Sequence, residues 1–322
     1  MIRLYFFLIL YSLFFSGCTS DSSKKALYIN SYHVGYPSSD QISLGVLNAF
    51  HDTSITLDSI CLDFKRNNSP DFIHEKVKAT MEKIRAFEAD ILLISDDAAM
   101  AHLIKPNMDS LNTPVLYCGI NWSAEKYALE PEKCSGMLEV LPIDTLLKTV
   151  KHVAPNYKSL TVLSENTLSA QNDKAVLEPI YHNNGFSVDY AFVDNFEEWK
   201  LAYQKAAKNA HLIYFPTNGA IQDWNEKEAL QLIQQHPAVM VTCDDFMMKY
   251  CLLGYTKVAI EQGNWMAGEA IALLQNSKNI TDIPVCSNQE IKKYINKSMM
   301  EIVDFPIQNI PSWESFNTED YE

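Results

Sequence analysis

Residues 26–40 read ALYINSYHVGYPSSD, and this stretch decides the fold. Residues 26–30 are a short, mostly apolar run typical of a buried strand, and residues 30–36 form a polar, ring-rich loop. A helix then begins that Ser39 or Asp40 can cap. A strand, a loop and a helix in this order form the repeating unit of a parallel sheet. The stretch therefore predicts an α/β protein.

The same unit recurs along the chain in two series. The predicted strands are 26–30, 55–62, 90–95 and 114–118 in the first series, and 160–164, 186–191, 211–215 and 238–242 in the second. Amphipathic segments between them predict helices at 70–87, 144–153, 170–183, 196–210 and 225–235. The series restarts after about residue 140, and 322 residues is about twice a typical domain. We therefore expect two Rossmann-like lobes whose parallel sheets are covered on both faces.

Two such lobes facing each other form a cleft that closes over a small molecule. Ligands of open parallel sheets bind beyond the carboxyl ends of the strands, so we expect binding residues directly after the strands. The candidates found there are Tyr32, His33, Tyr36, Ser95, Asp96, Asn121, Trp122, Asn166, Thr217, Asn218 and Asp244. Their rings can stack on a ligand or simply pack, and His33 can equally satisfy a backbone carbonyl.

Acid pairs stand at corresponding places in the two lobes, Asp96-Asp97 and Asp244-Asp245. On opposite walls of a cleft they suit the ammonium group of an amino acid or amine. Capping of a helix by one acid of each pair, with no ligand, is a second interpretation. A divalent cation site is a third.

Searches for catalytic motifs find no GxSxG elbow, no HExxH, no glycine-rich phosphate loop and no pyridoxal phosphate signature. The eight histidines are scattered. The sequence therefore predicts binding without chemistry, with no catalytic residue, metal site or cofactor.

The net charge bears on which partners the protein can bind, and the cysteine content bears on its disulfides. There are 26 basic against 40 acidic residues, a formal net charge of −14, which disfavours nucleic acid as a partner. The sequence has three arginines, Arg3, Arg66 and Arg85, so few side chains could bind the phosphate of a phosphorylated solute with two hydrogen bonds. Six cysteines follow Cys18 and read as small buried hydrophobes. If disulfides form, the pairs to consider first are Cys118–Cys134 and Cys243–Cys251.

The N-terminus has the pattern of a secretory signal. Residues 1–18 read MIRLYFFLILYSLFFSGC, with one basic residue before an apolar run over 4–15. As a helix this run rises about 18 Å, short of the roughly 30 Å core of a bilayer. Small residues before Cys18 resemble a bacterial lipobox, which predicts a lipid-anchored Cys18 and a polar tether over 19–25. Plain secretion and a retained signal anchor are the alternatives.

Several segments together resemble the ABC transporter substrate-binding family of the type I periplasmic binding fold, which also occurs as the sensor half of some histidine kinases. They are NSYHVGYPSSD (30–40), LDFKR (62–66), PVLYCGIN (114–121), GMLE (136–139), GNWMAGEA (263–270), IPV (283–285) and YIN (294–296). Ser38 departs from the usual Trp of the opening motif. Tyr255 stands where many members have Ala, which adds a tyrosine to the candidate cleft residues.

The resemblance implies two lobes joined by three crossings, near 138–141, 255–261 and 283–288. The predicted domains are a signal peptide (1–18), a tether (19–25), lobe 1 (26–138 plus 259–282), lobe 2 (139–256 plus 287–310) and a C-terminal tail (311–322).

The implied function is capture of a small molecule outside the cytoplasm, in the periplasm or at the cell surface, and delivery to a separate ABC permease and its ATPase. Ligand sensing with a signalling kinase is the alternative. Acids, rings and amides in one cleft fit a small zwitterion best, such as an aromatic or branched amino acid, with a sugar or peptide as the alternative.

Overall fold

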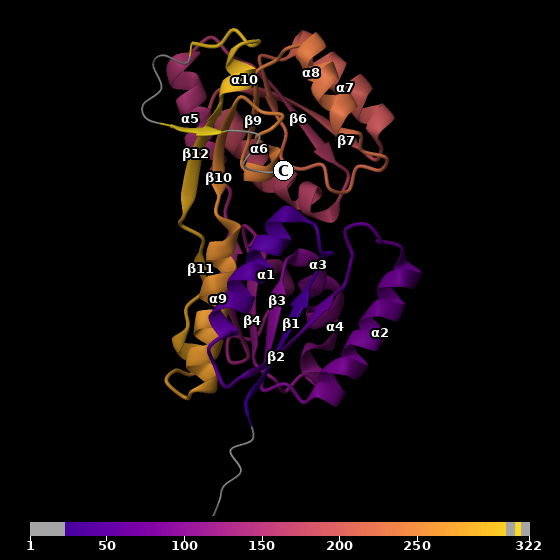
Figure 1. The fold of residues 1–322 in the computed structure, drawn as a ribbon, viewed down its shortest axis with the longest axis vertical. Coiled ribbons are helices and arrows are strands. Elements are labelled where there is room, and N and C mark those ends of the chain that lie inside the picture. Colours follow the sequence, from indigo (N-terminus) through magenta and orange to yellow (C-terminus); the bar gives the residue numbers. More distant parts are fainter. Residues whose placement is uncertain (1–22, 307–312, 317–322) are drawn as a thin grey trace, which may run out of the picture.

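The protein is described here from a computed structural model, which covers residues 23–306 and 313–316. It has two lobes, each built around its own sheet (Figure 1). The predicted signal peptide and Cys18 lie outside the described residues. Within those residues, no helix combines the length and the apolar character needed to cross a membrane.

The sheet of lobe 1 has six parallel strands in the order β11-β5-β4-β3-β1-β2. They are β1 (Lys25–Asn30), β2 (Thr56–Cys61), β3 (Ile91–Ser95), β4 (Val115–Asn121), β5 (Cys134–Glu139) and β11 (Cys286–Ser287). The longer helices are α1 (Pro37–Phe50), α2 (Pro70–Phe87) and α9 (Ala259–Leu274). Shorter helical segments are α3 (Asp97–Ala99), the π-helix η1 (Met100–Ile104), α4 (Lys105–Asn107), η2 (Met108–Ser110), η3 (Glu125–Tyr127) and η5 (Ile280–Asp282).

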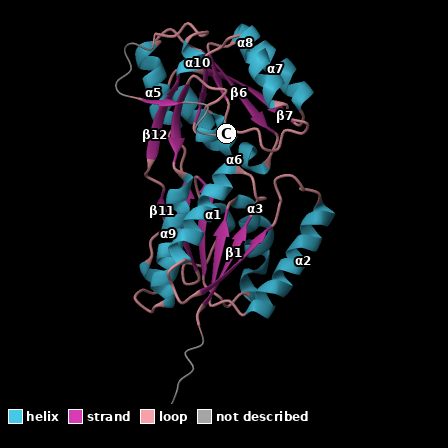
Figure 2. Cartoon of the chain, in the orientation of Figure 1, coloured by secondary structure: helices cyan, strands magenta, loops and turns pink. Residues whose placement is uncertain are grey.

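Both faces of this sheet are buried, as Figure 2 also shows from the helices on either side. Leu27 and Ile29 of β1 join one apolar cluster, whereas Ala26 and Tyr28 join another together with α1 and α9. Alternate residues of a strand point to opposite faces, so one continuous apolar run feeds two cores. Gly263 lets α1 and α9 pack closely, since a Cβ there would lie only 2.1 Å from the carbonyl oxygen of Ile42.

The sheet of lobe 2 has seven strands in the order β13-β12-β10-β9-β8-β6-β7. They are β6 (Ser159–Glu165), β7 (Ser187–Val193), β8 (Leu212–Tyr214), β9 (Met240–Thr242), β10 (Leu253–Lys257), β12 (Ile291–Asn296) and β13 (Glu314–Phe316). Its helices are α5 (Ile143–Val153), α6 (Leu168–Asn183), α7 (Phe196–Asn209), α8 (Glu226–Gln235), η4 (Asp245–Met247) and α10 (Lys297–Met300). The pair β10–β12 is antiparallel, and β13, within the segment predicted as a tail, pairs with β12.

The chain passes between the two sheets after β5, after β10 and after β11. In Figure 1, β10, β12, β11 and α9 lie along one side of the molecule, so the crossings gather there. Two parallel-sheet lobes of α/β class, as expected from the sequence, are thus confirmed. The exact lobe limits given above stay a prediction.

One local expectation is wrong. Neither Ser39 nor Asp40 caps α1, because the helix starts earlier, with Tyr36 at the N-cap position and Pro37 in its first turn. Proline suits that turn because its missing N–H has no partner to lose there. Asp40 instead accepts a hydrogen bond from the backbone N–H of Gly35, at 2.8 Å.

The six described cysteines are unpaired, and Cys118, Cys134, Cys243 and Cys251 are buried. These four behave as small core residues, and neither of the two pairs considered, Cys118–Cys134 and Cys243–Cys251, forms a disulfide.

Candidate functional site

A small polar chamber lies where the two lobes meet, with a volume of about 50 Å³. Its charged and aromatic lining comes from both lobes: Tyr32, Tyr36, Lys65, Asp96, Glu139, Glu165, Asp173, Asp244 and Lys257. Most of these residues stand at or just after the carboxyl ends of strands, where parallel sheets present their ligand sites. Of the described residues in the lining, five carry carboxyl groups and two carry ammonium groups. The chamber therefore has an excess of acids.

Lys65 of lobe 1 and Glu165 of lobe 2 connect the two walls. The distance from Lys65 Nζ to Glu165 Oε1 is 2.5 Å, and both side chains are buried. Lys65 Nζ also donates to the hydroxyl of Tyr36 at 3.2 Å and lies over the Tyr32 ring, 5.1 Å from its centre. Burial alone would lower the pKa of Lys65, but the Glu165 carboxylate outweighs burial and raises it. Lys65 is thus a charged bridge that holds the lobes together.

Lys257, at the end of β10, forms a second buried cluster on the crossing strands. Its ammonium group pairs with the Glu139 carboxylate and lies 3.2 Å from Asp244 Oδ1. Gln262 of α9 donates to Glu139 Oε2 at 2.8 Å and accepts from the backbone N–H of Gly119 at 2.7 Å. One network therefore joins the ends of β4, β5 and β10. The chain crosses between the lobes directly after β5 and β10.

Asp96 is different, because one oxygen of its carboxyl group has no partner among the described residues. Its Oδ2 is buried and has no hydrogen-bond partner within the described part of the chain. Burial, followed by the nearby Glu139, raises the pKa of Asp96 to about 8. Its backbone also adopts a φ of 72°, which is unusual for a residue other than glycine. A strained, unpartnered carboxyl group at a cleft is a typical feature of a ligand site.

Burial also raises the pKa values of two further acids of the chamber, Asp173 to about 7 and Asp244 to about 6. For Asp173 the Trp122 hydrogen bond acts in the opposite direction, and for Asp244 the Lys257 charge does. Near neutral pH the chamber therefore holds carboxyl groups that a bound cation would help to ionise.

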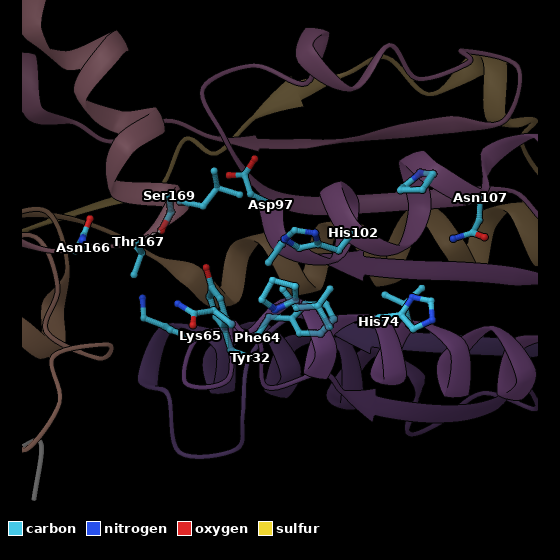
Figure 3. A pocket seen from close by; sticks show the side chains of 17 residues that line it. Tyr32, Phe64, Lys65, His74, Asp97, His102, Asn107, Asn166, Thr167 and Ser169 are labelled. Carbon is cyan, nitrogen blue, oxygen red and sulfur yellow. Dashed lines mark hydrogen bonds between the residues drawn. The ribbon is translucent and has the colours of Figure 1, made fainter. Parts of the chain in front are cut away.

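A much larger cavity, of about 710 Å³, opens from the same place along lobe 1 (Figure 3). Asn166, Thr167 and Ser169 from the start of α6 lie at one end of it, and His74 and Asn107 at the other. Tyr32, Lys65 and Ser169 line both this cavity and the chamber. The two spaces are therefore neighbours that share part of their walls.

The structure brings many of the sequence-predicted site residues together. Tyr32, Tyr36, Asp96, Asn121, Thr217 and Asp244 line the chamber, and Asn166 lines the large cavity with Tyr32. Asp96 and Asp244 come from different lobes and face the same space, as the paired positions suggested.

Other predicted residues line neither space. His33 lies beside Asp63, with Nδ1 3.4 Å from Oδ1, and Ser95 bonds to the Tyr28 hydroxyl at 3.1 Å. Trp122 donates its Nε1–H to Asp173 across the lobes at 2.8 Å. Asn218 interacts with the Tyr250 hydroxyl.

Tyr255 also lines neither space and instead packs within lobe 2. Its hydroxyl lies 3.1 Å from that of Thr149 on α5, and its ring packs edge-on against Trp313. Lys257, two residues on, lies on the same face of β10 as Tyr255 but at the carboxyl end of the strand, where it lines the chamber.

The structure also bears on the two alternative interpretations of the acid pairs, helix capping and a metal site. Asp96 and Asp244 occupy N-cap positions of short helical segments, but neither side chain makes a capping hydrogen bond. Asp97 is held by the Tyr127 hydroxyl, by Lys126 and by the backbone N–H of Asn121. Among the residues that the structure describes, no group of three or more His, Cys, Asp or Glu side chains could hold a metal ion.

Sequence reasoning did not choose Lys65, Glu139, Glu165, Asp173 and Lys257 as site residues. A signal existed for Glu139 and Lys257: each is a charged residue at the end of a strand whose burial pattern is mostly or wholly buried. A charge in such a position needs a partner, and so predicts an ion pair.

Comparisons with known proteins agree with this geometry. The family model for ABC transporter substrate binding proteins matches residues 31–312. A curated relative, "Tyrosine-binding protein" from Clostridioides difficile, is 23% identical over 297 residues, covering 88% of this chain and 83% of the relative.

Among solved structures, an ABC domain from Streptococcus pneumoniae in complex with L-Trp has a TM-score of 0.69 at 14% identity, covering 91% of this chain and 99% of that one. A ligand-free, open substrate binding protein from Clostridium difficile has a TM-score of 0.65 at 14% identity, covering 92% and 99%. The fold is therefore that of the type I periplasmic binding proteins. This chain belongs to the family of ABC transporter substrate binding proteins, which bind small molecules outside the cytoplasm for ABC permeases and are not enzymes.

Proposed function

We propose that the protein captures a small zwitterion between its lobes, by an ammonium group that binds at Asp96, and delivers it to an ABC permease. Aromatic and branched amino acids are the simplest ligands of this kind. The observation that carries the proposal is the buried Asp96 Oδ2, which has no partner in the described residues, in a chamber with more carboxyl than ammonium groups.

Two further observations support an amino acid rather than a sugar. The rings of Tyr32 and Tyr36 lie beside the acids, and the Lys65 ammonium group already lies over both. Tyr32 also lines the large cavity, where its ring gives an apolar body a surface to contact. The curated relative described above is a tyrosine-binding protein, and the neighbour solved with L-Trp has a TM-score of 0.69, against 0.59–0.60 for the neighbours whose names give a sugar, ribose or myo-inositol.

The proposal is tested by calorimetry with the mature protein and panels of amino acids and sugars. We expect an aromatic or branched amino acid to bind. Asp96→Asn should lower its affinity by roughly 10- to 150-fold, the effect of losing about 1.5–3 kcal/mol from a hydrogen bond to a charged group. Asp52→Asn is the matched control, because the Asp52 side chain is 97% exposed. Binding of sugars with no heat from any amino acid or amine would contradict the proposal.

We propose in addition that the mature protein is a lipoprotein anchored through Cys18. The support is the apolar run over 4–15 followed by Ser16 and Gly17 directly before this cysteine. Multiple acyl chains hold a protein stably on a membrane. In cell fractionation, Cys18→Ser should therefore move the protein from the membrane to the soluble fraction. Unchanged fractionation would reject acylation.

A further inference from the structure

The two spaces at the lobe interface differ greatly in size. Pockets that enclose small-molecule ligands usually measure about 300–1,000 Å³. The chamber, at about 50 Å³, is far below this range, and the neighbouring cavity, at about 710 Å³, lies within it. With the lobes in this arrangement, the chamber accommodates a head group, and the body of a ligand has space only in the cavity.

The walls of the large cavity are mainly apolar. Phe64, Ile73 and Val77 line one side, on α2 and the loop before it, and Ala98 and His102 line the other, on α3 and η1. His102 lies edge-on to the Phe64 ring, and burial lowers its pKa, which favours the neutral imidazole. Such walls suit an uncharged, apolar body.

The lysine and the aspartate of this lining, Lys65 and Asp97, are both already paired within the protein. The remaining polar groups are mainly neutral, and three are amides: Asn68, Asn107 and Asn166. Asn107 already donates to the Leu103 carbonyl, and Asn166 donates to Asp194 and accepts from Gln171. A side-chain amide has two N–H donors and an oxygen with two lone pairs, so the positions left unused can satisfy the N–H and C=O groups of a peptide backbone.

The outer end of the cavity opens to solvent, since Asn68, Pro70 and His74 are exposed. The inner end meets the chamber at Tyr32, Lys65 and Ser169. A molecule whose head enters the chamber can therefore extend past these residues along the cavity toward solvent.

We propose that the physiological ligand is a short peptide with apolar side chains, bound with its free N-terminus toward Asp96 and its body along the cavity between α2 and η1. This inference rests on the proposed function for the head group and extends it beyond a single amino acid. A free amino acid fills the inner end, and the second residue of a peptide adds the contacts with Phe64, Ile73 and Val77.

The test compares phenylalanine, Phe-Leu and N-acetyl-Phe-Leu by calorimetry on the mature protein. Phe-Leu should bind about ten- to 150-fold more tightly than phenylalanine, the effect of burying one more apolar side chain. N-acetyl-Phe-Leu should bind at least about tenfold more weakly than Phe-Leu, because it has no ammonium group for Asp96.

Val77→Trp, which fills the cavity from α2, should weaken Phe-Leu at least about tenfold and change phenylalanine less than about twofold. Lys78→Trp is the matched control, since Lys78 is exposed on the same helix and should change neither. If circular dichroism shows that Val77→Trp does not fold, Ala98→Leu fills the same cavity from the opposite wall.

The outcomes separate the two proposals. Phenylalanine binding as tightly as Phe-Leu, or filling variants that leave Phe-Leu unchanged, would overturn the peptide assignment while the amino-acid function stands. N-acetyl-Phe-Leu binding as tightly as Phe-Leu, with sensitivity to Val77→Trp, would overturn the Asp96 head-group site while the cavity assignment stands.

Discussion

The two acid pairs at the cleft occupy corresponding places in the two lobes but have opposite surroundings. Asp244 of lobe 2 lies 3.2 Å from the ammonium group of Lys257, which also holds Glu139. Asp96 of lobe 1 has a buried oxygen without a partner in the described part of the chain. A strand end places an acid at the cleft, but the residue that faces it decides its role. Asp244 belongs to the support of the crossing strands, whereas Asp96 remains available to a ligand.

The largest expected effect concerns the ion-paired acid, Asp244, and its partner Lys257. Lys257→Met removes the cation and leaves Glu139 and Asp244 buried with like charges. Breaking a buried ion pair from one side costs about 3–5 kcal/mol, so we expect a loss of this size in the free energy of unfolding, measured by chemical denaturation. Lys292→Met is the control, because Lys292 is exposed on β12. An unchanged midpoint in Lys257→Met would show that the cluster does not support the crossings.

Asp96→Asn should have the opposite effect on stability. The pKa of Asp96 is about 8 in the folded protein against an ordinary 3.8, so the folded state holds a proton that the unfolded state releases. Stability is therefore lost as pH rises from about 4 to about 8. Removing the ionisable group should raise the free energy of unfolding by about 1–3 kcal/mol at pH 8, and by much less at pH 4. A variant less stable than the parent at pH 8 would mean that Asp96 has a structural partner.

The same group should make ligand binding depend on pH. Below pH 8 the Asp96 carboxyl is mostly protonated without ligand, and a bound ammonium group favours its ionised form. Binding should therefore release a proton, and affinity should rise by up to about tenfold per pH unit between pH 6 and pH 8, then level off. Calorimetry in buffers of different ionisation enthalpy measures the proton release. Asp96→Asn should abolish it, and equal proton release by both proteins would assign the titration elsewhere.

The smallest expected effect concerns a contact between lobes outside the acid pairs. Trp122→Phe keeps an aromatic ring but removes the N–H that donates to Asp173. We expect the contact between the lobes to lose about 0.5–1.5 kcal/mol, which would be measured as up to about tenfold weaker ligand binding. Trp265→Phe, on α9, where this partly buried ring packs against the lobe 1 core, should leave affinity unchanged. If Trp122 instead stacked on the ligand, Trp122→Phe would retain most of the affinity and only Trp122→Ala would lose it.

Residues 26–30, 90–95 and 114–118 show how much the sequence by itself determines. Their unbroken apolar runs specify strands buried on both faces, because a polar side chain on either face would lose its hydration. The recurrence of strand and helix specifies two lobes, and the ends of the strands specify where the cleft lies. The sequence alone could therefore place four residues at the cleft: Tyr32, Tyr36, Asp96 and Asp244.

The tertiary structure alone decided which of these residues are paired within the protein and which can contact a ligand. Lys65 and Glu165 are 100 positions apart, and Lys257 and Glu139 are 118 apart, so no local pattern links them. Trp122 and Tyr255 were misleading, because a ring after or within a strand looks the same in sequence whether it faces a ligand, the other lobe or a helix. Local periodicity reports burial, whereas pairing across a cleft depends on how two separately folded sheets approach each other. The unpaired state of Asp96 is a property of that approach.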